Sequence, residues 1–444
     1  MLPVASLGIG PYNSDMQTRN SAMSQRILIS LTAILCTAPI FAANFPDVEQ
    51  LPSQTALPDP LVMLNGQRVT TKEQWVNERR PELKALFQHY MYGYFPPAPA
   101  NTRFNLLYGK ANFFDGKATL REYAIEFGPN HAGRVNLLVI IPNKRQKPAP
   151  VFLGMNFCGN HTVVADPGIA LPKAWMPKSC RGCTNNQATD AGRGTQVETW
   201  AIEQSIDRGY AFATFYMGDL DPDKNDFSDG VHALYFKPGQ TNRNAQDWGS
   251  IAAWAWGFSR CVDYLVTRED LDPARIAAVG HSRNGKASLL AAAFDERISL
   301  VIPLQAGCGG TAPSRGKIGE SVKQINNAFP HWFNDEFKKF NEQPDRLPFD
   351  QHCLIALVAP RAVLLANATE DTWANPKGQF EMLQAAEPVY RLLDAGSLDA
   401  KEMPETGKLI ASKLGYYIRP GKHSMTTPDW QVFLDYADAQ WGKP

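Results

Sequence analysis

The sequence has no excess of charge of either sign. Lysine and arginine together number 44, and aspartate and glutamate also number 44. A chain without a net positive field lacks the feature that attracts proteins to nucleic acid or to an anionic membrane surface. Nucleic-acid binding is therefore not expected. The sequence also contains no internal repeat and no low-complexity linker, so nothing divides its main part into separate units.

Metal-binding patterns are missing as well. The chain has 8 histidines and 7 cysteines. Cys180 and Cys183 have the spacing of a zinc or redox motif, but no second pair and no histidine cluster completes a zinc site. We interpret this pair as part of a surface loop and expect neither a metal nor an organic cofactor. In an oxidising compartment the cysteines can form disulfides, in pairings that the sequence does not specify.

The long hydrophobic run at 27–41 is too short to span a bilayer comfortably. It follows Arg26 and ends in small residues, which is the pattern of a secretory signal peptide. We therefore expect residues 1–43 to be a signal peptide, with Met23 as an alternative start. A lipid anchor at Cys36 is less favoured because the preceding leucine is not small. The mature protein is expected to be secreted, into the periplasm or the medium, and not bound to a membrane.

Hydrophobic residues make up 44% of the whole sequence, which is enough for a large core, and the part after residue 43 predicts an α/β protein. A proline-rich arm at 44–60 precedes helical periodicity at 71–94 and alternating, antiparallel strands at 102–141. Short continuous hydrophobic runs then alternate with helical stretches, which is typical of a parallel sheet buried on both faces. These runs are Pro150–Gly154, Ala211–Phe215, Ile276–Gly280, Leu300–Pro303 and Ala362–Ala366. We expect residues 44–444 to form a single domain, a three-layer αβα sandwich.

A serine-centred turn joins one of these strands to a helix. The predicted strand 275–279 leads into Gly280-His281-Ser282, and residues 287–294 are rich in alanine and leucine, which favour helix. This is the setting of a nucleophile elbow, in which Ser282 stands at the carboxyl end of a strand. The pattern departs from G-x-S-x-G, because Asn284 occupies the second glycine position. An ordinary strand-to-helix turn is the alternative.

A nucleophilic serine needs a base, usually a histidine that a carboxylate orients. His423 follows a strand-like segment and precedes a predicted helix, so it lies in a loop at the expected sheet edge. Asp371 follows another buried strand, and Glu370 is its nearest rival. The order Ser282, Asp371, His423 is that of α/β-hydrolases. The remaining candidate histidines have other expected places: His281 is expected to point away from the serine hydroxyl, and His331 and His352 to be structural or to line a pocket.

Two cations accompany the serine. Arg283 follows it directly and places a permanent charge where acyl transfer develops an oxyanion. Lys286 lies on the first turn of the predicted helix, from which it can reach a hydroxyl-rich or acidic substrate. A solvated helix lysine is the alternative for Lys286.

These residues carry a family resemblance. Gly280–Lys286 resembles the G-x-S-R-x-G-K signature of glucuronoyl esterases, which belong to carbohydrate esterase family fifteen and hydrolyse esters between the glucuronic acid of xylan and lignin alcohols. Further segments look like the bacterial branch, and together they cover most of residues 60–440. They are Asn156–Thr162, Gly307–Gly310, Asp350–His352, Ala359–Arg361, Asp371–Pro376 and Gly421–His423.

The resemblance implies roles for individual residues. Ser282 is the implied nucleophile, His423 the base and Arg283 the oxyanion stabiliser. The residues implied to bind the uronic sugar or to line its pocket are Lys286, Glu320, Trp373 and Trp332, and we also place Gln305 among the substrate-binding residues. Two positions depart from the family: His281 replaces a cysteine that forms a disulfide in fungal members, and Gln305 stands where many members have a catalytic glutamate. We therefore assign the acid of the triad to Asp371.

We expect a secreted serine esterase, a monomer, that acts on glucuronoxylan and lignin-carbohydrate esters through a glucuronoyl-serine intermediate. Two alternatives remain. The first is a broader carbohydrate esterase, for example an acetyl xylan esterase. The second is a carbohydrate-binding protein that kept the pocket and lost catalysis. Only Gln305 favours the last alternative.

Overall fold

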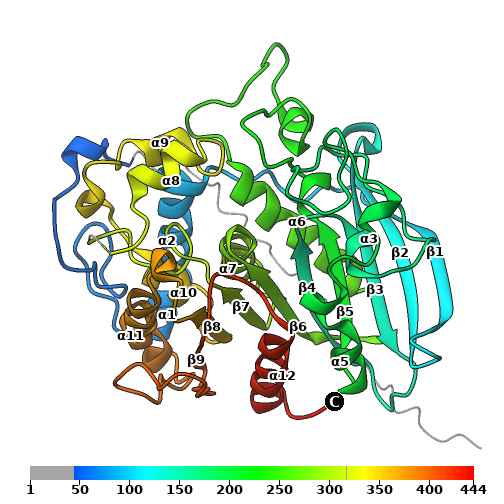
Figure 1. Cartoon of the computed structure of the whole chain (residues 1–444). Coiled ribbons are helices and arrows are strands. Elements are labelled where there is room, and N and C mark those ends of the chain that lie inside the picture. Colours follow the sequence, from blue (N-terminus) through cyan, green and yellow to red (C-terminus); the bar gives the residue numbers. More distant parts are fainter. Residues whose placement is uncertain (1–44, 317) are drawn as a thin grey trace, which may run out of the picture. The chain divides into compact units, whose positions relative to one another are not determined.

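The computed structural model describes residues 45–316 and 318–444 (Figure 1). The predicted signal peptide lies outside these residues, and its assignment stays a prediction. The described residues form one compact unit. In the part of the chain that is described, no helix has the length and hydrophobicity needed to cross a membrane.

A nine-stranded sheet forms the centre of this unit, in the order β1-β2-β3-β5-β4-β6-β7-β8-β9 (Figure 1). Its strands are β1 (Arg103–Phe113), β2 (Ala118–Phe127), β3 (Gly133–Pro142), β4 (Ala149–Asn156), β5 (Ala211–Tyr216), β6 (Leu271–His281), β7 (Leu300–Leu304), β8 (Ala362–Ala368) and β9 (Leu414–Arg419). The pairs from β1 to β3, and the pair β3–β5, are antiparallel. All other pairs are parallel. This confirms the predicted α/β fold with a mostly parallel sheet.

Helices cover both faces of the sheet. One face carries α6 (Ser250–Leu265), α7 (Arg283–Phe294), α10 (Gln351–Ala356) and α11 (Pro376–Leu392). The other carries α4 (Val197–Trp200), α5 (Ile202–Asp207) and α12 (Thr427–Trp441). The remaining α-helices are α1 (Lys72–Gln74), α2 (Arg80–Phe87), α3 (Asn160–Val163), α8 (Val322–Ala328) and α9 (Asp335–Lys338). The layers are therefore helix, sheet and helix, as expected.

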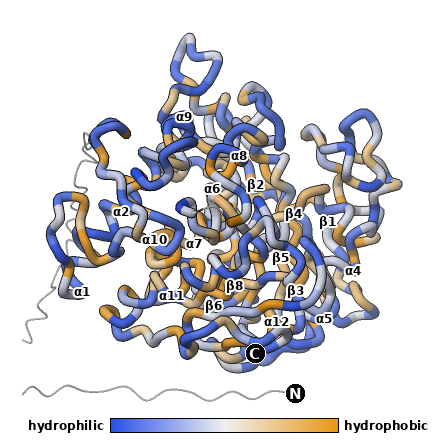
Figure 2. The backbone as a smooth tube through the Cα atoms, turned by 60° about the vertical axis from the view of Figure 1, so that its left-hand side comes forward, coloured by the Kyte–Doolittle hydropathy of each residue, from blue (hydrophilic) through white to orange (hydrophobic). Residues whose placement is uncertain are grey.

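The two hydrophobic cores explain why the strands are hydrophobic without interruption. Along β8, Val363 and Leu365 belong to one core, whereas Leu364 and Ala366 belong to the other. Successive side chains of a strand point to opposite faces, so a strand covered on both sides needs a hydrophobic residue at every position. In Figure 2 the orange segments accordingly gather along the inner strands and α6, while blue segments predominate in the outer loops.

The helical segment before the sheet is continuous but not regular. The predicted helix at 71–94 consists of α1 and α2 interrupted by π-helical turns at Trp75–Arg79 and Gln88–Tyr92. The arm before it packs on this segment, since the Tyr90 hydroxyl donates to the carbonyl of Pro46 at 2.6 Å. Val48 and Leu51 of the arm are buried.

Parallel strands bring their carboxyl ends to one edge. Immediately beyond these ends lie Ser282 after β6, Gln305 after β7, Asp371 after β8 and His423 after β9. The fold thus gathers at one edge of the sheet residues that the sequence separates widely.

Candidate active site

The turn between β6 and α7 is a strained elbow. Ser282 has φ 59° and ψ −123°, a conformation that residues with a side chain rarely adopt. The turn closes tightly because residue 280 is glycine: a Cβ there would lie 2.0 Å from the carbonyl oxygen of Asn284. The elbow therefore presents the serine side chain beyond the end of β6.

Asn284 explains the departure from the usual elbow sequence. Its side chain is fully buried, and its Nδ2 donates to the carbonyl of Met155 at 2.8 Å. This hydrogen bond ties the first turn of α7 to β4, so the asparagine takes part in holding the elbow against the neighbouring strand.

His423 and Asp371 form a hydrogen-bonded pair. Nδ1 of His423 lies 2.7 Å from Oδ2 of Asp371. The carboxylate is buried, with its side chain 5% exposed, while the imidazole is 42% exposed. Glu370 is exposed instead, and its N–H donates to the carbonyl of Gly421 at 3.0 Å. The geometry thus favours Asp371 over Glu370 as the partner of the histidine.

Ser282 and His423 line one cavity of about 290 Å³. Among the described residues, no hydrogen bond joins the serine hydroxyl to the imidazole. Catalytic hydrogen bonds are often long in the absence of substrate and shorten only in the reacting complex. The cavity contains every residue that the sequence analysis assigned to the site: Ser282, Arg283, Lys286, Gln305, Glu320, Trp332, Asp371, Trp373 and His423.

Among the described residues, no hydrogen bond joins Gln305 to the imidazole of His423. Oε1 of Gln305 is 2.9 Å from Nε2 of His281 and accepts a hydrogen bond of 2.9 Å from the N–H of Ser424. The rings of His281 and His423 lie with centroids 4.5 Å apart. Burial, reinforced by the neighbouring His423, lowers the pKa of His281 to about 3. Gln305 therefore fixes a neutral His281 and the backbone beside His423.

Arg283 is anchored by a carboxylate that sequence reasoning missed. Its Nη1 pairs with Oδ2 of Asp223. Asp223 also accepts hydrogen bonds from Nε2 of His331 at 2.9 Å and from Nε1 of Trp332 at 2.8 Å. Burial raises the pKa of Asp223, but these donors and the charge of Arg283 outweigh it, so the pKa lies below its ordinary value.

The Arg283 guanidinium also packs on aromatic rings, 4.9 Å from that of Trp332 and 5.4 Å from that of Phe329. Its Nε is buried and has no hydrogen-bond partner among the described residues. The group is thus held on one side by Asp223 and keeps a free donor on another. A buried donor of this kind binds an anionic oxygen strongly.

Lys286 lies beneath the cavity rather than in solvent. It is 4% exposed, and its Nζ donates to the carbonyls of Ala306 at 2.5 Å and Cys308 at 2.6 Å. Burial lowers its pKa. An ammonium has three N–H donors, so these two bonds leave one for a ligand. The alternative of a solvated helix lysine is wrong.

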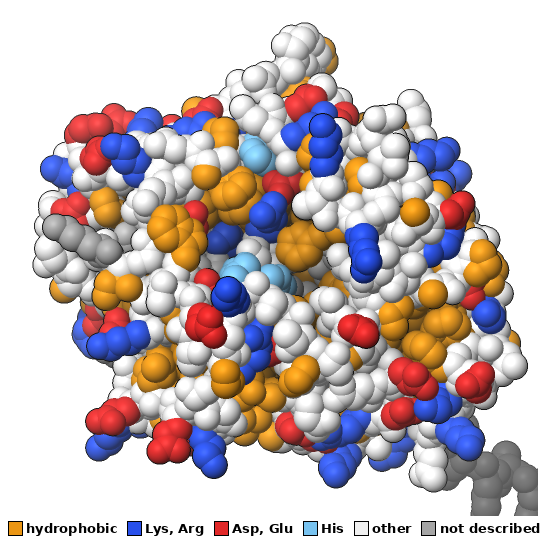
Figure 3. Space-filling model, viewed as in Figure 1, with side chains coloured by type: hydrophobic (Ala, Val, Ile, Leu, Met, Phe, Trp, Pro, Cys, Tyr) orange, Lys and Arg blue, Asp and Glu red, His pale blue; other side chains and the backbone are white. Residues whose placement is uncertain are grey.

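Glu320 and Trp373 border the same cavity. The N–H of Glu320 donates to the carbonyl of Trp373 at 3.0 Å, which joins their two loops. Burial raises the pKa of Glu320, and the nearby charge of Lys286 opposes this shift. Trp373 is 53% exposed. Its ring is available as a flat surface at the rim. Figure 3 shows a hollow on this face of the molecule where histidine, cationic and hydrophobic side chains meet.

The interpretation of Cys180 as part of a surface loop was wrong. Cys180 is buried and bonded to Cys158, which lies just after β4. Cys183 is not part of this disulfide. The bond crosslinks two loops near Phe157, whose ring lies 6.2 Å from that of His281.

His331 and His352, which were expected to be structural or to line a pocket, have different surroundings. Nε2 of His331 forms a hydrogen bond with Asp223. His352 is fully buried, with its Nε2 2.7 Å from the carbonyl of Pro58.

Sequence comparisons place this arrangement among known enzymes. The family model of fungal glucuronyl esterases matches residues 187–394. A carbohydrate esterase called MZ0003, from an unknown prokaryotic organism, is 46% identical over 394 residues, which cover 88% of this chain and 91% of that protein. The 4-O-methyl-glucuronoyl methylesterase 1 of Wolfiporia cocos is 26% identical, with 84% of this chain and 82% of that protein covered.

Solved structures give the same result. A promiscuous CE15 esterase from a marine bacterial metagenome matches with a TM-score of 0.81 and 45% identity, covering 89% of this chain and 99% of that one. A glucuronoyl esterase from Solibacter usitatus matches with a TM-score of 0.81 and 38% identity, covering 89% and 100% of the two chains.

Proposed function

The chain belongs to the glucuronoyl esterase family, CE15, and is a carboxylic ester hydrolase; from this premise we propose that it cleaves esters of (4-O-methyl-)glucuronic acid through an acyl-serine intermediate. The observation that carries the proposal is the 2.7 Å hydrogen bond between His423 and Asp371 in the cavity that also contains the elbow serine. An imidazole oriented in this way is the base that a serine hydroxyl requires.

The first half of the proposed reaction acylates Ser282. Nε2 of His423 takes the hydroxyl proton as the oxygen attacks the ester carbonyl carbon, and Asp371 stabilises the imidazolium that results. The carbonyl oxygen becomes anionic and is met by the charge of Arg283, whose buried Nε has no other partner among the described residues. When the bond to the alcohol breaks, His423 returns the proton to the leaving oxygen.

The second half releases the uronic acid. Water takes the place of the alcohol, His423 removes its proton, and the hydroxide attacks the acyl carbon. Collapse of this intermediate breaks the bond to Ser282, and His423 gives the proton back to the serine oxygen. A Ser282→Ala variant is expected to lose turnover and to keep binding of the sugar, because the hydroxyl supplies chemistry rather than sugar contacts.

Recognition of the uronic sugar is assigned to the remaining cavity residues. Lys286 has one free donor and Glu320 is an acceptor, so the two suit the hydroxyl groups of a sugar ring. The ring of Trp332 is fixed by its hydrogen bond to Asp223, and that of Trp373 stands at the rim. The exposed ring of Trp373 can cover an apolar sugar face, while the buried Trp332 lines the cavity.

The decisive assay measures hydrolysis of benzyl glucuronate beside benzyl galacturonate and an acetyl ester. A clear preference for the glucuronate is the expected result, and no hydrolysis of it would exclude the proposal. A broader carbohydrate esterase is the second candidate, because the matching marine bacterial structure is that of a promiscuous CE15 esterase. Comparable rates on the acetyl ester would favour it.

The proposal has three further parts. The alcohols released from the natural substrate are lignin alcohols, the protein is secreted, and it acts as a monomer.

The non-catalytic alternative is not favoured. Gln305 was the reason to consider it, but among the described residues no hydrogen bond joins Gln305 to His423, and Asp371 supplies a carboxylate to the imidazole. Trapping of Ser282 by a fluorophosphonate would test this directly, since a protein without a working base reacts slowly.

A further inference from the structure

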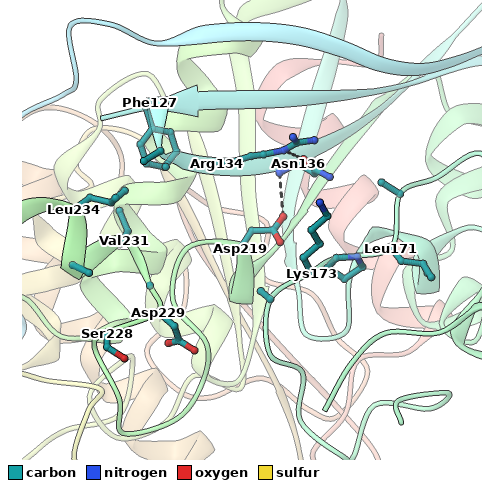
Figure 4. Close-up of a pocket in the computed structure, with 17 residues that line it drawn as sticks. Phe127, Arg134, Asn136, Leu171, Lys173, Asp219, Ser228, Asp229, Val231 and Leu234 are labelled. Carbon is teal, nitrogen blue, oxygen red and sulfur yellow. Dashed lines mark hydrogen bonds between the residues drawn. The ribbon is translucent and has the colours of Figure 1, made fainter. Parts of the chain in front are cut away.

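A second cavity, of about 520 Å³, lies outside the candidate active site (Figure 4). It is bordered by the start of β3, by the loop at 170–174 and by the segment 217–234 that follows β5. The volume falls in the usual range of small-molecule sites, about 300–1,000 Å³. None of the reaction steps proposed above uses it.

Polar groups converge on its floor. Oδ2 of Asp219 accepts a hydrogen bond from the N–H of Asn136 at 3.1 Å, the dashed line in Figure 4, where Lys173 lies beside the carboxyl group. Among the described residues, none donates to Oδ1 of Asp219. Arg134 and Asp229 line the same space. The cavity therefore offers both acceptors and donors that a ligand can use.

The charges of these groups select against a strongly charged ligand. The carboxyl of Asp219 lies near the buried Glu122, and burial together with this neighbour raises the pKa of Asp219 to about 7. The carboxyl group of Asp219 on the floor and that of the neighbouring Glu122 oppose an anion. Arg134 and Lys173 oppose a cation. A neutral ligand with many hydroxyl groups can use both kinds of group without a net desolvated charge.

Hydrophobic side chains complete the walls. Figure 4 shows Phe127, Val231 and Leu234 on one side of the floor and Leu171 on the other. Sugars combine hydroxyl groups at the ring edge with C–H groups on the ring faces, so they match a cavity with polar groups between apolar walls.

The cavity is connected to the active site through one segment of chain. Asp219 lines its floor, and Asp223 of the same segment holds Arg283. Four residues of chain span at most about 14 Å.

We propose that this cavity binds a neutral pyranose unit of a saccharide chain, with Asp219 and Lys173 contacting its hydroxyl groups. The inference rests on the proposed function, because the polysaccharide that carries a glucuronoyl ester has a neutral backbone that extends beyond the ester. The ligand class is thus a neutral oligosaccharide of the xylan type.

Calorimetric titration with xylotetraose tests the site, using an Ala132→Trp variant. Ala132 is exposed and lines the cavity, so a tryptophan there fills the space without removing buried atoms. We expect at least a tenfold loss of affinity. Ala56→Trp, at an exposed position away from the cavity, is the matched control and should bind as the wild type does. Thermal midpoints verify that both variants fold.

A second variant probes the chemistry. Lys173→Ala removes one donor from an exposed side chain and is expected to weaken xylotetraose binding several-fold. Undiminished binding by Ala132→Trp, or no binding of xylotetraose by the wild type, would overturn the proposal. Tighter binding of glucuronic acid than of xylotetraose, abolished by Ala132→Trp, would also overturn it, because the ligand would then be an anion.

The esterase proposal is tested separately on the wild type with benzyl glucuronate, which has no saccharide chain. Hydrolysis of this ester without xylotetraose binding refutes the second site alone. Absence of hydrolysis refutes the esterase proposal, whatever xylotetraose does.

Discussion

Replacement of Asp371 by asparagine should reduce kcat on benzyl glucuronate by roughly 10³ to 10⁴-fold. The buried carboxylate faces Nδ1 of His423 at 2.7 Å, and the imidazole is half exposed. At an effective dielectric constant of about 20, two unit charges about 4 Å apart attract by about 4 kcal/mol. Since about 1.4 kcal/mol changes a rate tenfold, losing this attraction to the imidazolium slows acylation by about 10³-fold.

The amide has a further effect on the tautomer. Its NH₂ group can donate to Nδ1, which would leave the proton of His423 on Nε2, where the serine proton must arrive. The corresponding aspartate-to-asparagine change in a serine protease costs about 10⁴-fold for this reason. Steady-state kinetics at saturating ester measures kcat, and the thermal midpoint verifies folding.

Two matched variants separate Asp371 from its neighbours. Gln305→Ala should be milder, about tenfold, because Gln305 forms hydrogen bonds with His281 and the N–H of Ser424 rather than with His423. Glu370→Gln should keep nearly full activity, because its side chain is exposed. Nearly full activity of Asp371→Asn together with inactive Glu370→Gln would refute the reasoning and move the acid by one residue.

Three further predictions follow from the same geometry. Arg283→Ala should lower kcat at least 100-fold with a smaller change in KM, because its charge matters most when the carbonyl oxygen becomes anionic; a change confined to KM would contradict this. Lys286→Met and Glu320→Gln should each weaken the discrimination between glucuronate and galacturonate esters, as measured by the ratio of kcat/KM values, and an unchanged ratio in both would move recognition elsewhere. Asp219→Asn should raise the thermal midpoint more at pH 8 than at pH 5. The folded state holds the pKa of Asp219 at about 7, against an ordinary value of 3.8. The folded protein therefore loses stability as the pH rises from about 4 to about 7, whereas asparagine does not titrate and avoids this loss. Equal midpoint changes at both pH values would show that the pKa of this carboxyl group is not raised in the folded state.

The positions of Ser282, Asp371 and His423 at one edge of the sheet were predictable because each residue follows a hydrophobic strand in the sequence. Ser282, Asp371 and His423 all stand one to a few residues beyond a run of buried residues, and parallel strands necessarily end at one edge. The sequence favoured Asp371 and left Glu370 as its rival. The structure adds the difference between these adjacent acidic residues, because Asp371 forms a hydrogen bond with His423 whereas Glu370 is exposed.

Asp223 was missed for a related reason. It lies in the long connection between β5 and α6, where several aspartates alternate with glycine and proline and no periodicity distinguishes one from another. Its function depends on Arg283, His331 and Trp332, which come from distant parts of the chain. The pairing of Cys158 with Cys180 escaped for the same reason, because only the folded loops bring these two cysteines together.

The backbone conformation of Ser282 lowers the stability of the folded protein at a position that the proposed reaction needs. A residue with a side chain in this conformation costs about 1–3 kcal/mol, and glycine would adopt it freely at a smaller entropic cost of about 0.5–1 kcal/mol. A laboratory selection for heat resistance alone would therefore favour Ser282→Gly, which removes the proposed nucleophile. Directed evolution of this enzyme for thermal stability must therefore measure turnover in every round, or be restricted to positions remote from the elbow.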